Sequence, residues 1–199
     1  KIQKLIDYEI IGLDHIDVDN PLKGNLVIFK HSQHLELDAR LLAMNIPIYG
    51  VSRTHNSVSM NNIQEKGRLS SIKDTADKNN PRKFMRWLKD GKNVLYAIDQ
   101  DYGWEHSVKL KFFNQDAATI TSVKKIVDIT DCNLLFINSF YEKNKIILTL
   151  ESIANMGLNA PELSQKINDL MEEKILQYPA EYLWVHRRFK STLGKEFYQ

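Results

Sequence analysis

The stretch "KHSQHLELDARLL", Lys30 to Leu42, brings two histidines, a glutamate and an aspartate into one short segment. A histidine can take a proton from a hydroxyl, and a carboxylate can hold the imidazole in the tautomer that does so. His31 and Glu36 are therefore candidate catalytic residues, as a base and its orienter that activate a hydroxyl nucleophile. We interpret His34 as a supporting residue and Asp38 as a surface residue of the following helix.

The apolar run "NLVIF" (25–29) directly precedes this segment and predicts a strand. His31 then lies at the carboxyl end of a strand, where open α/β sheets bind their ligands. Residues five apart on a helix point about 140° away from each other, so His31 and Glu36 can meet only if His31 precedes the helix. The exposed N–H groups at the helix start favour a neutral His31. The simpler alternative is that His31 only caps the helix while Glu36 faces solvent.

Two aspartates follow another predicted strand, in the block "IDQDYG". Asp99 and Asp101 would share one side of an extended chain, again at a carboxyl end. Such a pair can bind a divalent cation with a nucleotide sugar, or orient a catalytic arginine. A turn rich in aspartate and glycine, with no chemical role, is an equally good interpretation.

Positive charge is concentrated in three places. Arg53 follows the second predicted strand, Arg68 lies in "EKGRLSS", and the stretch "WVHRRFK" contributes Arg187, Arg188 and Lys190. The planar guanidinium of arginine suits phosphate and carboxylate groups. The stretch "WVHRRFK" fits a nucleic-acid contact, or a segment that packs its aromatic rings and exposes its charges.

Composition limits the classes of function. The 199 residues are 43% hydrophobic, which suits one globular domain spanning 1–199. Lys and Arg total 27 against 25 Asp and Glu, and a net charge of +2 excludes a polyanion binder that acts through bulk charge. The single cysteine, Cys132, excludes an internal disulfide and a cysteine-rich metal site. No apolar run approaches the roughly 20 residues that cross a bilayer.

Short apolar runs alternate with helical patterns, which predicts an α/β fold with a mixed central β-sheet flanked by helices. The predicted strands are 24–30, 46–52, 93–98, 133–140 and 144–150. A polar turn between the last two predicts a hairpin, and hence a mixed sheet. The predicted helices run from Pro81 to just before Gly91, from near Asp116 onwards, and from Pro161 to Pro179.

In order along the chain, these blocks resemble one family, the lipid A biosynthesis lauroyl/myristoyl (late) acyltransferases of Gram-negative bacteria. The resemblance covers nearly the whole chain, through "YEIIGLDHI", "HSQHLELDARLL", "GVSRTHNS", "EKGRLSS", "GKNVLYAIDQDYG", "VKLKFFNQDAATIT" and "PAEYLWVHRRFK". It implies a glycerolipid-acyltransferase-like fold at the cytoplasmic face of the inner membrane. The chain begins at Lys1, and we expect it to lack the membrane-anchoring segment that the family carries at its N-terminus.

The resemblance also implies a reaction. A fatty acyl group would move from an acyl carrier protein thioester to the 3-hydroxyl of an acyl chain on a lipid A precursor, without a metal or other cofactor. The partners expected are acyl carrier protein, the lipid A precursor and the membrane surface, with no nucleic acid. Because acyl carrier protein is acidic, Arg187, Arg188 and Lys190 are candidates for its docking site.

The residues of the site are implied one by one. The family's His-x4-Glu motif falls on His31 and Glu36, which implies a catalytic dyad. Arg68 and Asp99 match residues on which the family relies, and we expect Asp99 to hold Arg68. Arg53 matches a further arginine, and Asp101 belongs to the same block as Asp99.

Other functions stay open on the sequence. An acyltransferase acting on another glycolipid or glycerolipid would use the same dyad. A metal-dependent glycosyltransferase would use Asp99 and Asp101 as cation ligands, but this leaves the His31 block unexplained. A module that binds RNA or an acidic protein through "WVHRRFK" is disfavoured by the near-neutral net charge.

Overall fold

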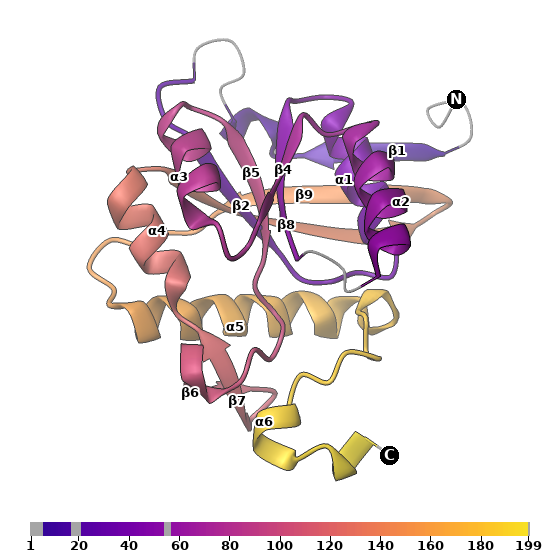
Figure 1. The fold of residues 1–199 in the computed structure, drawn as a ribbon. Coiled ribbons are helices and arrows are strands. Elements are labelled where there is room, and N and C mark those ends of the chain that lie inside the picture. Colours follow the sequence, from indigo (N-terminus) through magenta and orange to yellow (C-terminus); the bar gives the residue numbers. More distant parts are fainter. Residues whose placement is uncertain (1–5, 17–20, 54–56, 199) are drawn as a thin grey trace.

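The computed structural model describes residues 6–16, 21–53 and 57–198. Residues Thr54–Asn56 of the block "GVSRTHNS" therefore lie outside the described part. Within it, a seven-stranded sheet has the order β1-β9-β8-β2-β5-β3-β4 (Figure 1). The strands, in that order, are Asp7–Ile11, Lys145–Ser152, Asn133–Glu142, Asn25–Phe29, Asn93–Ala97, Ile48–Ser52 and Asp74–Asp77. β8, β2, β5, β3 and β4 are parallel, whereas β9 and β1 run the opposite way, so the predicted mixed sheet is confirmed.

Helices cover both faces of this sheet (Figure 1). The α-helices of the described residues are α1 (Leu35–Ala43), α2 (Val58–Leu69), α3 (Pro81–Lys89), α4 (Ser122–Thr130), α5 (Ala160–Gln177) and α6 (Lys190–Leu193), of which α6 lies apart from the sheet. Along β2, Leu26 and Ile28 pack into the core beneath α3, α4 and α5, while Val27 packs into the core beneath α1. This alternation follows from the two-residue period of a strand, and burial on both faces explains the unbroken apolar run.

Two predicted helices have the expected bounds because their ends carry strong signals. Pro81 occupies the first turn of α3, and Gly91 follows its end with φ 75°. Asn159 and Glu162 form a capping box at the start of α5, in which each side chain accepts from the other residue's backbone N–H.

The prediction of a helix that begins near Asp116 is wrong for the first part of that segment. Residues Gln115–Ile120 form β7, which pairs with β6 (Ser107–Phe112) in a separate two-stranded sheet, and α4 begins only at Ser122. The two strands are joined by Phe113 and Asn114, both with positive φ (49° and 59°). A two-residue turn of this kind matches the twist of paired strands, so the chain makes a hairpin here.

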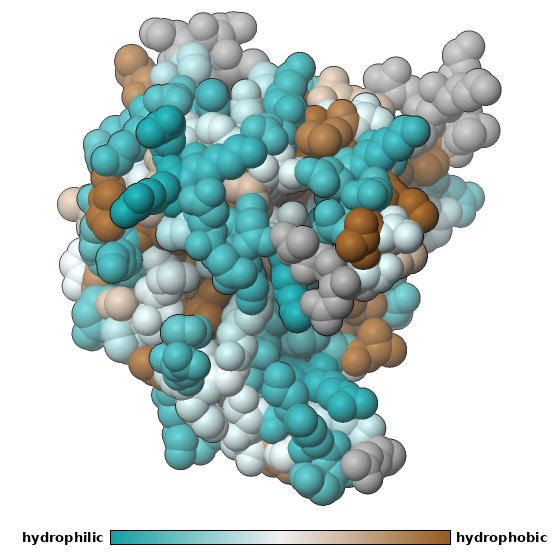
Figure 2. All heavy atoms as spheres, viewed as in Figure 1, coloured by the Kyte–Doolittle hydropathy of each residue, from teal (hydrophilic) through white to brown (hydrophobic). Residues whose placement is uncertain are grey.

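Helix α2 packs only loosely on the fold. None of its residues is buried, and Val58 and Ile63 are 75% and 66% exposed. Figure 2 shows hydrophobic side chains over α2 on an otherwise largely hydrophilic face. Arg40 on α1 donates to the Gly67 carbonyl at 3.0 Å, so polar contacts help to hold α2. No helix in the described ranges is both long and apolar enough to cross a membrane.

The register of the parallel strands decides which residues meet at their carboxyl ends. Phe29 of β2 pairs with Ala97 of β5, and Ser52 of β3 pairs with Asp77 of β4. The residues that follow these strands therefore share one edge of the sheet. The C-terminal segment crosses the same edge, where the Leu183 N–H donates to the His31 carbonyl at 3.1 Å.

Candidate active site

His31 and Asp99 form a pair at this edge of the sheet. Each follows its strand by two residues, and the register of β2 with β5 places them opposite each other. The Nδ1 of His31 lies 2.6 Å from Oδ1 of Asp99, and the His31 backbone N–H donates to Oδ2 at 2.8 Å. Asp99 is 1% exposed, so one buried carboxylate fixes both the ring and the backbone of His31.

The charge of Asp99 fixes the tautomer of His31. Burial alone would raise the pKa of Asp99, but the hydrogen bonds and charge of His31 outweigh it and leave this pKa below its usual value. An ionised carboxylate only accepts, so Nδ1 of His31 is a donor, and in the neutral ring the lone pair then lies on Nε2. The amide Nε2 of Gln100 lies 3.2 Å from this nitrogen. The neutral His31 ring is thus held in the tautomer that can accept a proton at Nε2.

A second histidine, which the sequence did not single out, lies against this pair. The His186 ring stacks on His31 with centroids 6.4 Å apart, and its Nε2 accepts from the Asp101 N–H at 3.4 Å. Burial lowers the pKa of His186, which favours the neutral ring. His186 lies in "WVHRRFK", a stretch whose sequence we interpreted only through its positive charges and aromatic rings. Only the fold brings this histidine to His31.

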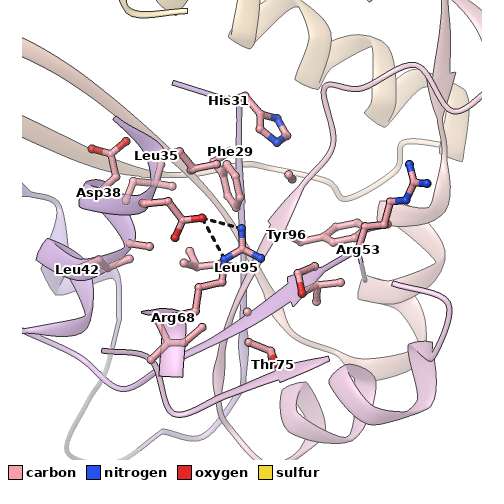
Figure 3. Close-up of a pocket in the computed structure, with 18 of the residues that line it drawn as sticks. Phe29, His31, Leu35, Asp38, Leu42, Arg53, Arg68, Thr75, Leu95 and Tyr96 are labelled. Carbon is pink, nitrogen blue, oxygen red and sulfur yellow. Dashed lines mark hydrogen bonds and ion pairs between the residues drawn. The ribbon is translucent and has the colours of Figure 1, made fainter. Parts of the chain in front are cut away.

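Glu36 contacts Arg68, not His31. The Nη2 and Nε of Arg68 donate to Oε1 of Glu36 at 2.6 and 3.0 Å (Figure 3). Two expected pairings are therefore wrong, because Asp99 holds His31 and Glu36 holds Arg68. The reason is positional: α1 begins at Leu35, and its first turn directs Glu36 towards the last turn of α2 rather than back to the strand end.

These groups open onto one pocket of about 320 Å³. Four of the six predicted catalytic and support residues, His31, Glu36, Arg53 and Arg68, line it, and Asp99 contacts His31 from behind the ring. Its apolar wall includes Phe29, Leu35, Leu42 and Leu95 (Figure 3), together with Ile72 and Ile137. The volume lies within the range of about 300 to 1,000 Å³ that is typical of ligand sites. The pocket therefore combines a proton acceptor with a wall suited to a hydrocarbon chain.

Sequence comparison adds the family. Residues 1–191 match the family model described as bacterial lipid A biosynthesis acyltransferase. The chain belongs to this family. It is 29% identical over 197 residues to the lipid A biosynthesis palmitoleoyltransferase of Escherichia coli strain K12, across 96% of this chain and 63% of the relative. It is 33% identical over 190 residues to the lauroyltransferase of the same strain, across 92% and 62%.

A third relative comes from another organism. The chain is 26% identical over 189 residues to a lipid A biosynthesis acyltransferase of Haemophilus influenzae strain Rd, across 92% of this chain and 60% of the relative. The chain thus spans about three fifths of the length of these relatives.

Asp101 is bound by the C-terminal segment of this family member. Its carboxylate accepts from the backbone N–H and hydroxyl of Ser191 (2.7 and 2.6 Å) and from the Gly103 N–H (2.9 Å). Burial raises the pKa of Asp101, but these hydrogen bonds more than offset it and leave the pKa lowered. Since His31 engages Asp99, the two carboxylates do not converge as metal ligands. No group of three or more His, Cys, Asp or Glu in the described residues is placed to hold a metal ion.

The prediction that Arg188 helps to dock acyl carrier protein is wrong. Arg188 is only 3% exposed and donates to the Ala118 carbonyl (2.7 Å) and to Oγ1 of Thr119 (2.9 Å). It packs beneath the β6–β7 hairpin and cannot meet a partner protein. Arg187 is exposed and Lys190 is partly exposed, so these two stay candidates.

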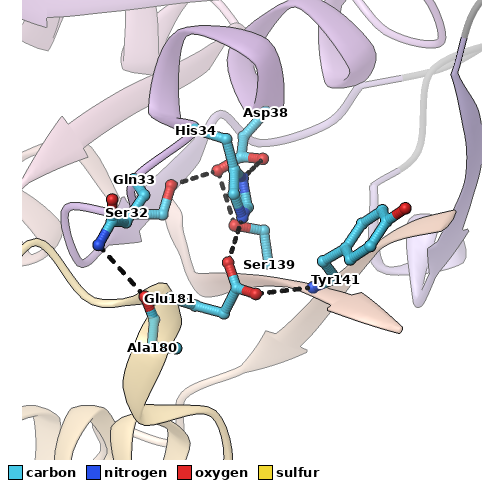
Figure 4. Close-up of polar contacts among 8 residues, drawn as sticks. All are labelled: Ser32, Gln33, His34, Asp38, Ser139, Tyr141, Ala180 and Glu181. Atoms are coloured by element: carbon cyan, nitrogen blue, oxygen red, sulfur yellow. Dashed lines mark hydrogen bonds and ion pairs between the residues drawn. The ribbon is translucent and has the colours of Figure 1, made fainter. Parts of the chain in front are cut away.

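A second polar cluster adjoins the segment that follows His31, and two of its members, Asp38 and Ser139, also line the pocket (Figure 4). Asp38 is 6% exposed, not on the surface as predicted, and accepts from the hydroxyls of Ser32 (2.7 Å) and Ser139 (2.6 Å). His34 contacts Asp38 through Nδ1 and Glu181 through Nε2, both at 2.7 Å. The hydrogen bond to Asp38 raises the pKa of His34, against the effect of burial. This cluster joins the segment after His31, β8 and the C-terminal segment.

Proposed function

We propose that this family member transfers a fatty acyl chain from an acyl carrier protein thioester to the 3-hydroxyl of an acyl chain on a lipid A precursor. The observation that carries the proposal is the position of the His31 ring, which lines an apolar pocket while its Nδ1 contacts the buried carboxylate of Asp99. A hydroxyl on a fatty chain is a weak nucleophile, and a positioned base is what it needs.

The proposed reaction runs through His31. Its Nε2 takes the proton from the acceptor hydroxyl as the oxygen attacks the thioester carbonyl. The carbon–sulfur bond then breaks, and the imidazolium returns its proton to the departing thiolate, so no other reactant is consumed. Asp99 stabilises the imidazolium between these steps and keeps the ring in position.

Glu36 takes a different role from the one expected. In this proposal it holds the Arg68 guanidinium in the pocket, where that charge can face the oxyanion formed at the carbonyl or a phosphate of a substrate. Glu36 is thus a positioning residue that acts through Arg68, and Asp99 is the orienter of the base.

The surroundings support the rest of the proposal. The apolar wall formed by Phe29, Leu42, Leu95 and Ile137 suits the acyl chain. The positive charges of Arg187 and Lys190 suit an acidic carrier protein. The acceptor would come from the cytoplasmic face of the inner membrane. A different glycolipid or glycerolipid acceptor would use the same chemistry at His31.

The test is mass spectrometry of lipid A from cells that lack the full-length protein, complemented with wild type or with His31→Gln. Wild type should restore one secondary acyl chain, and His31→Gln should not. Unchanged lipid A on deletion, with another lipid losing an acyl chain, would move the acceptor to that lipid. Full restoration by His31→Gln would remove the proposed base.

A further inference from the structure

Two cations lie side by side at the pocket, away from the Arg68–Glu36 pair. Arg53 and Lys78 each directly follow a strand, and the register of β3 with β4 pairs Ser52 with Asp77. The Lys78 N–H donates to the Ser52 carbonyl at 2.9 Å, which continues this pairing beyond the strands. Both side chains line the pocket that His31 lines. The fold therefore sets two positive charges next to each other at the site.

Lys78 is held where it lies. Its Nζ sits over the ring of Tyr102, 4.0 Å from the centroid, and such a contact fixes an ammonium group against an aromatic face. Burial and then the charge of Arg53 lower the pKa of Lys78, which agrees with two like charges at close range. Figure 3 shows the Arg53 guanidinium apart from that of Arg68.

Neither cation forms an ion pair with a carboxylate of the described residues. Arg68 is neutralised by Glu36, and the carboxylate of Asp99 is bound to His31. The Oδ1 of the adjacent Asp77 accepts from the Asn79 N–H at 2.7 Å, and its charge offsets only part of the effect of burial and Arg53, so the pKa of Lys78 stays lowered. Two adjacent positive charges repel each other, and a bound anion relieves that repulsion.

We propose that Arg53 and Lys78 form an anion site that binds a phosphate group of a substrate. A guanidinium and an ammonium together supply a planar fork and a point charge, and both suit phosphate oxygens. The choice of phosphate rests on the proposed function, because both substrates carry one. The phosphate belongs either to the headgroup of the lipid acceptor or to the phosphopantetheine arm of the carrier.

Binding measurements with the full-length protein distinguish these sources without turnover. The probes are 4′-phosphopantetheine against pantetheine, and glucosamine 1-phosphate against glucosamine, each titrated by calorimetry. Wild type should bind at least one phosphorylated probe about tenfold more tightly than its phosphate-free twin, as expected for one or more charge-assisted hydrogen bonds. The pair that shows this preference identifies the source, and a preference in both pairs means that the site reads the phosphate alone.

Variants test the residues. Arg53→Gln and Lys78→Gln should each remove most of the preference, whereas Lys78→Arg should keep it because the charge remains. Lys89→Gln is the matched control, since Lys89 is an exposed lysine on α3 that does not line the pocket. No preference in wild type, or a full preference in the double variant Arg53→Gln/Lys78→Gln, would overturn the proposal.

Acyl transfer by the same wild-type preparation separates this proposal from the proposed function. Phosphate-selective binding without any acyl transfer would leave the anion site standing and count against the acyltransferase reaction. Acyl transfer without phosphate-selective binding would support the acyltransferase reaction and overturn the anion site.

Discussion

His31 and His34 leave the same turn between β2 and α1, and each presents Nδ1 to a buried carboxylate, Asp99 at 2.6 Å and Asp38 at 2.7 Å. They differ at Nε2. That of His31 lies on the pocket side near an amide of Gln100, whereas that of His34 contacts a second carboxylate. A nitrogen that faces only a neutral amide can still accept a substrate proton, whereas a ring held between two carboxylates donates at both nitrogens. Two histidines three positions apart are thus a proposed base and a structural clamp.

The largest expected effect tests the difference at Nε2. His31→Gln should lower kcat for acyl transfer about 100-fold or more, the usual contribution of a general base, while His34→Gln should cost less than about tenfold. Asp99→Asn should lower kcat by a factor similar to that of His31→Gln, because a neutral amide cannot stabilise the imidazolium. His106→Gln, at an exposed histidine, is the control. Equal losses from His31→Gln and His34→Gln would end the distinction.

The next effect concerns stability. Asp38 is buried and receives three hydrogen bonds, so Asp38→Asn leaves donors without an acceptor. We expect the free energy of unfolding to fall by about 3 kcal/mol, as for a broken buried pair. Urea denaturation measures this, with the exposed Glu173→Gln as control. A change as small as that of the control would mean that the cluster does not stabilise the fold.

The third effect is a pH dependence. The hydrogen bond to Asp38 raises the pKa of His34 above its unfolded value near 6.5, so protonation stabilises the folded state. This stabilisation is fully present below pH 6.5 and is lost as the pH rises through the folded pKa. His34→Gln should therefore lower the free energy of unfolding by about 1.5 kcal/mol at pH 5.5, with a shrinking difference at higher pH. Urea unfolding across this range is the measurement, and a constant difference would contradict the clamp.

The smallest effect concerns Glu36. The Glu36 side chain is 57% exposed, so its ion pair with Arg68 is screened by solvent. Glu36→Gln should change the free energy of unfolding by less than about 1 kcal/mol, while the KM of acyl transfer should rise because Arg68 is no longer held. Arg68→Gln should raise the KM similarly. A KM equal to that of wild type in Glu36→Gln would remove its positioning role.

Local signals in the sequence were enough for much of the fold. The apolar runs predicted β2, β3, β5, β8 and β9, and the cap residues predicted α3 and α5. The β6–β7 hairpin was missed because Ala117, Ile120 and Val123 are apolar at spacings that also suit a helix. The pairing of the two strands and the turn at Phe113–Asn114 decided the outcome, and the alternating sequence "SVKLKF" of β6 was a strand signal that the helix prediction did not use.

The site shows the same division. The sequence by itself determined which side chains the pocket has to work with, because the end of the apolar run 25–29 places His31 and the neighbouring blocks supply Glu36 and Arg68. Only the tertiary structure decided their partners. The register of β2 with β5 puts Asp99 against His31, and the packing of α1 beside α2 puts Glu36 against Arg68. Hydrogen bonds act over about 3 Å, and a separation along the chain does not specify a distance of that size.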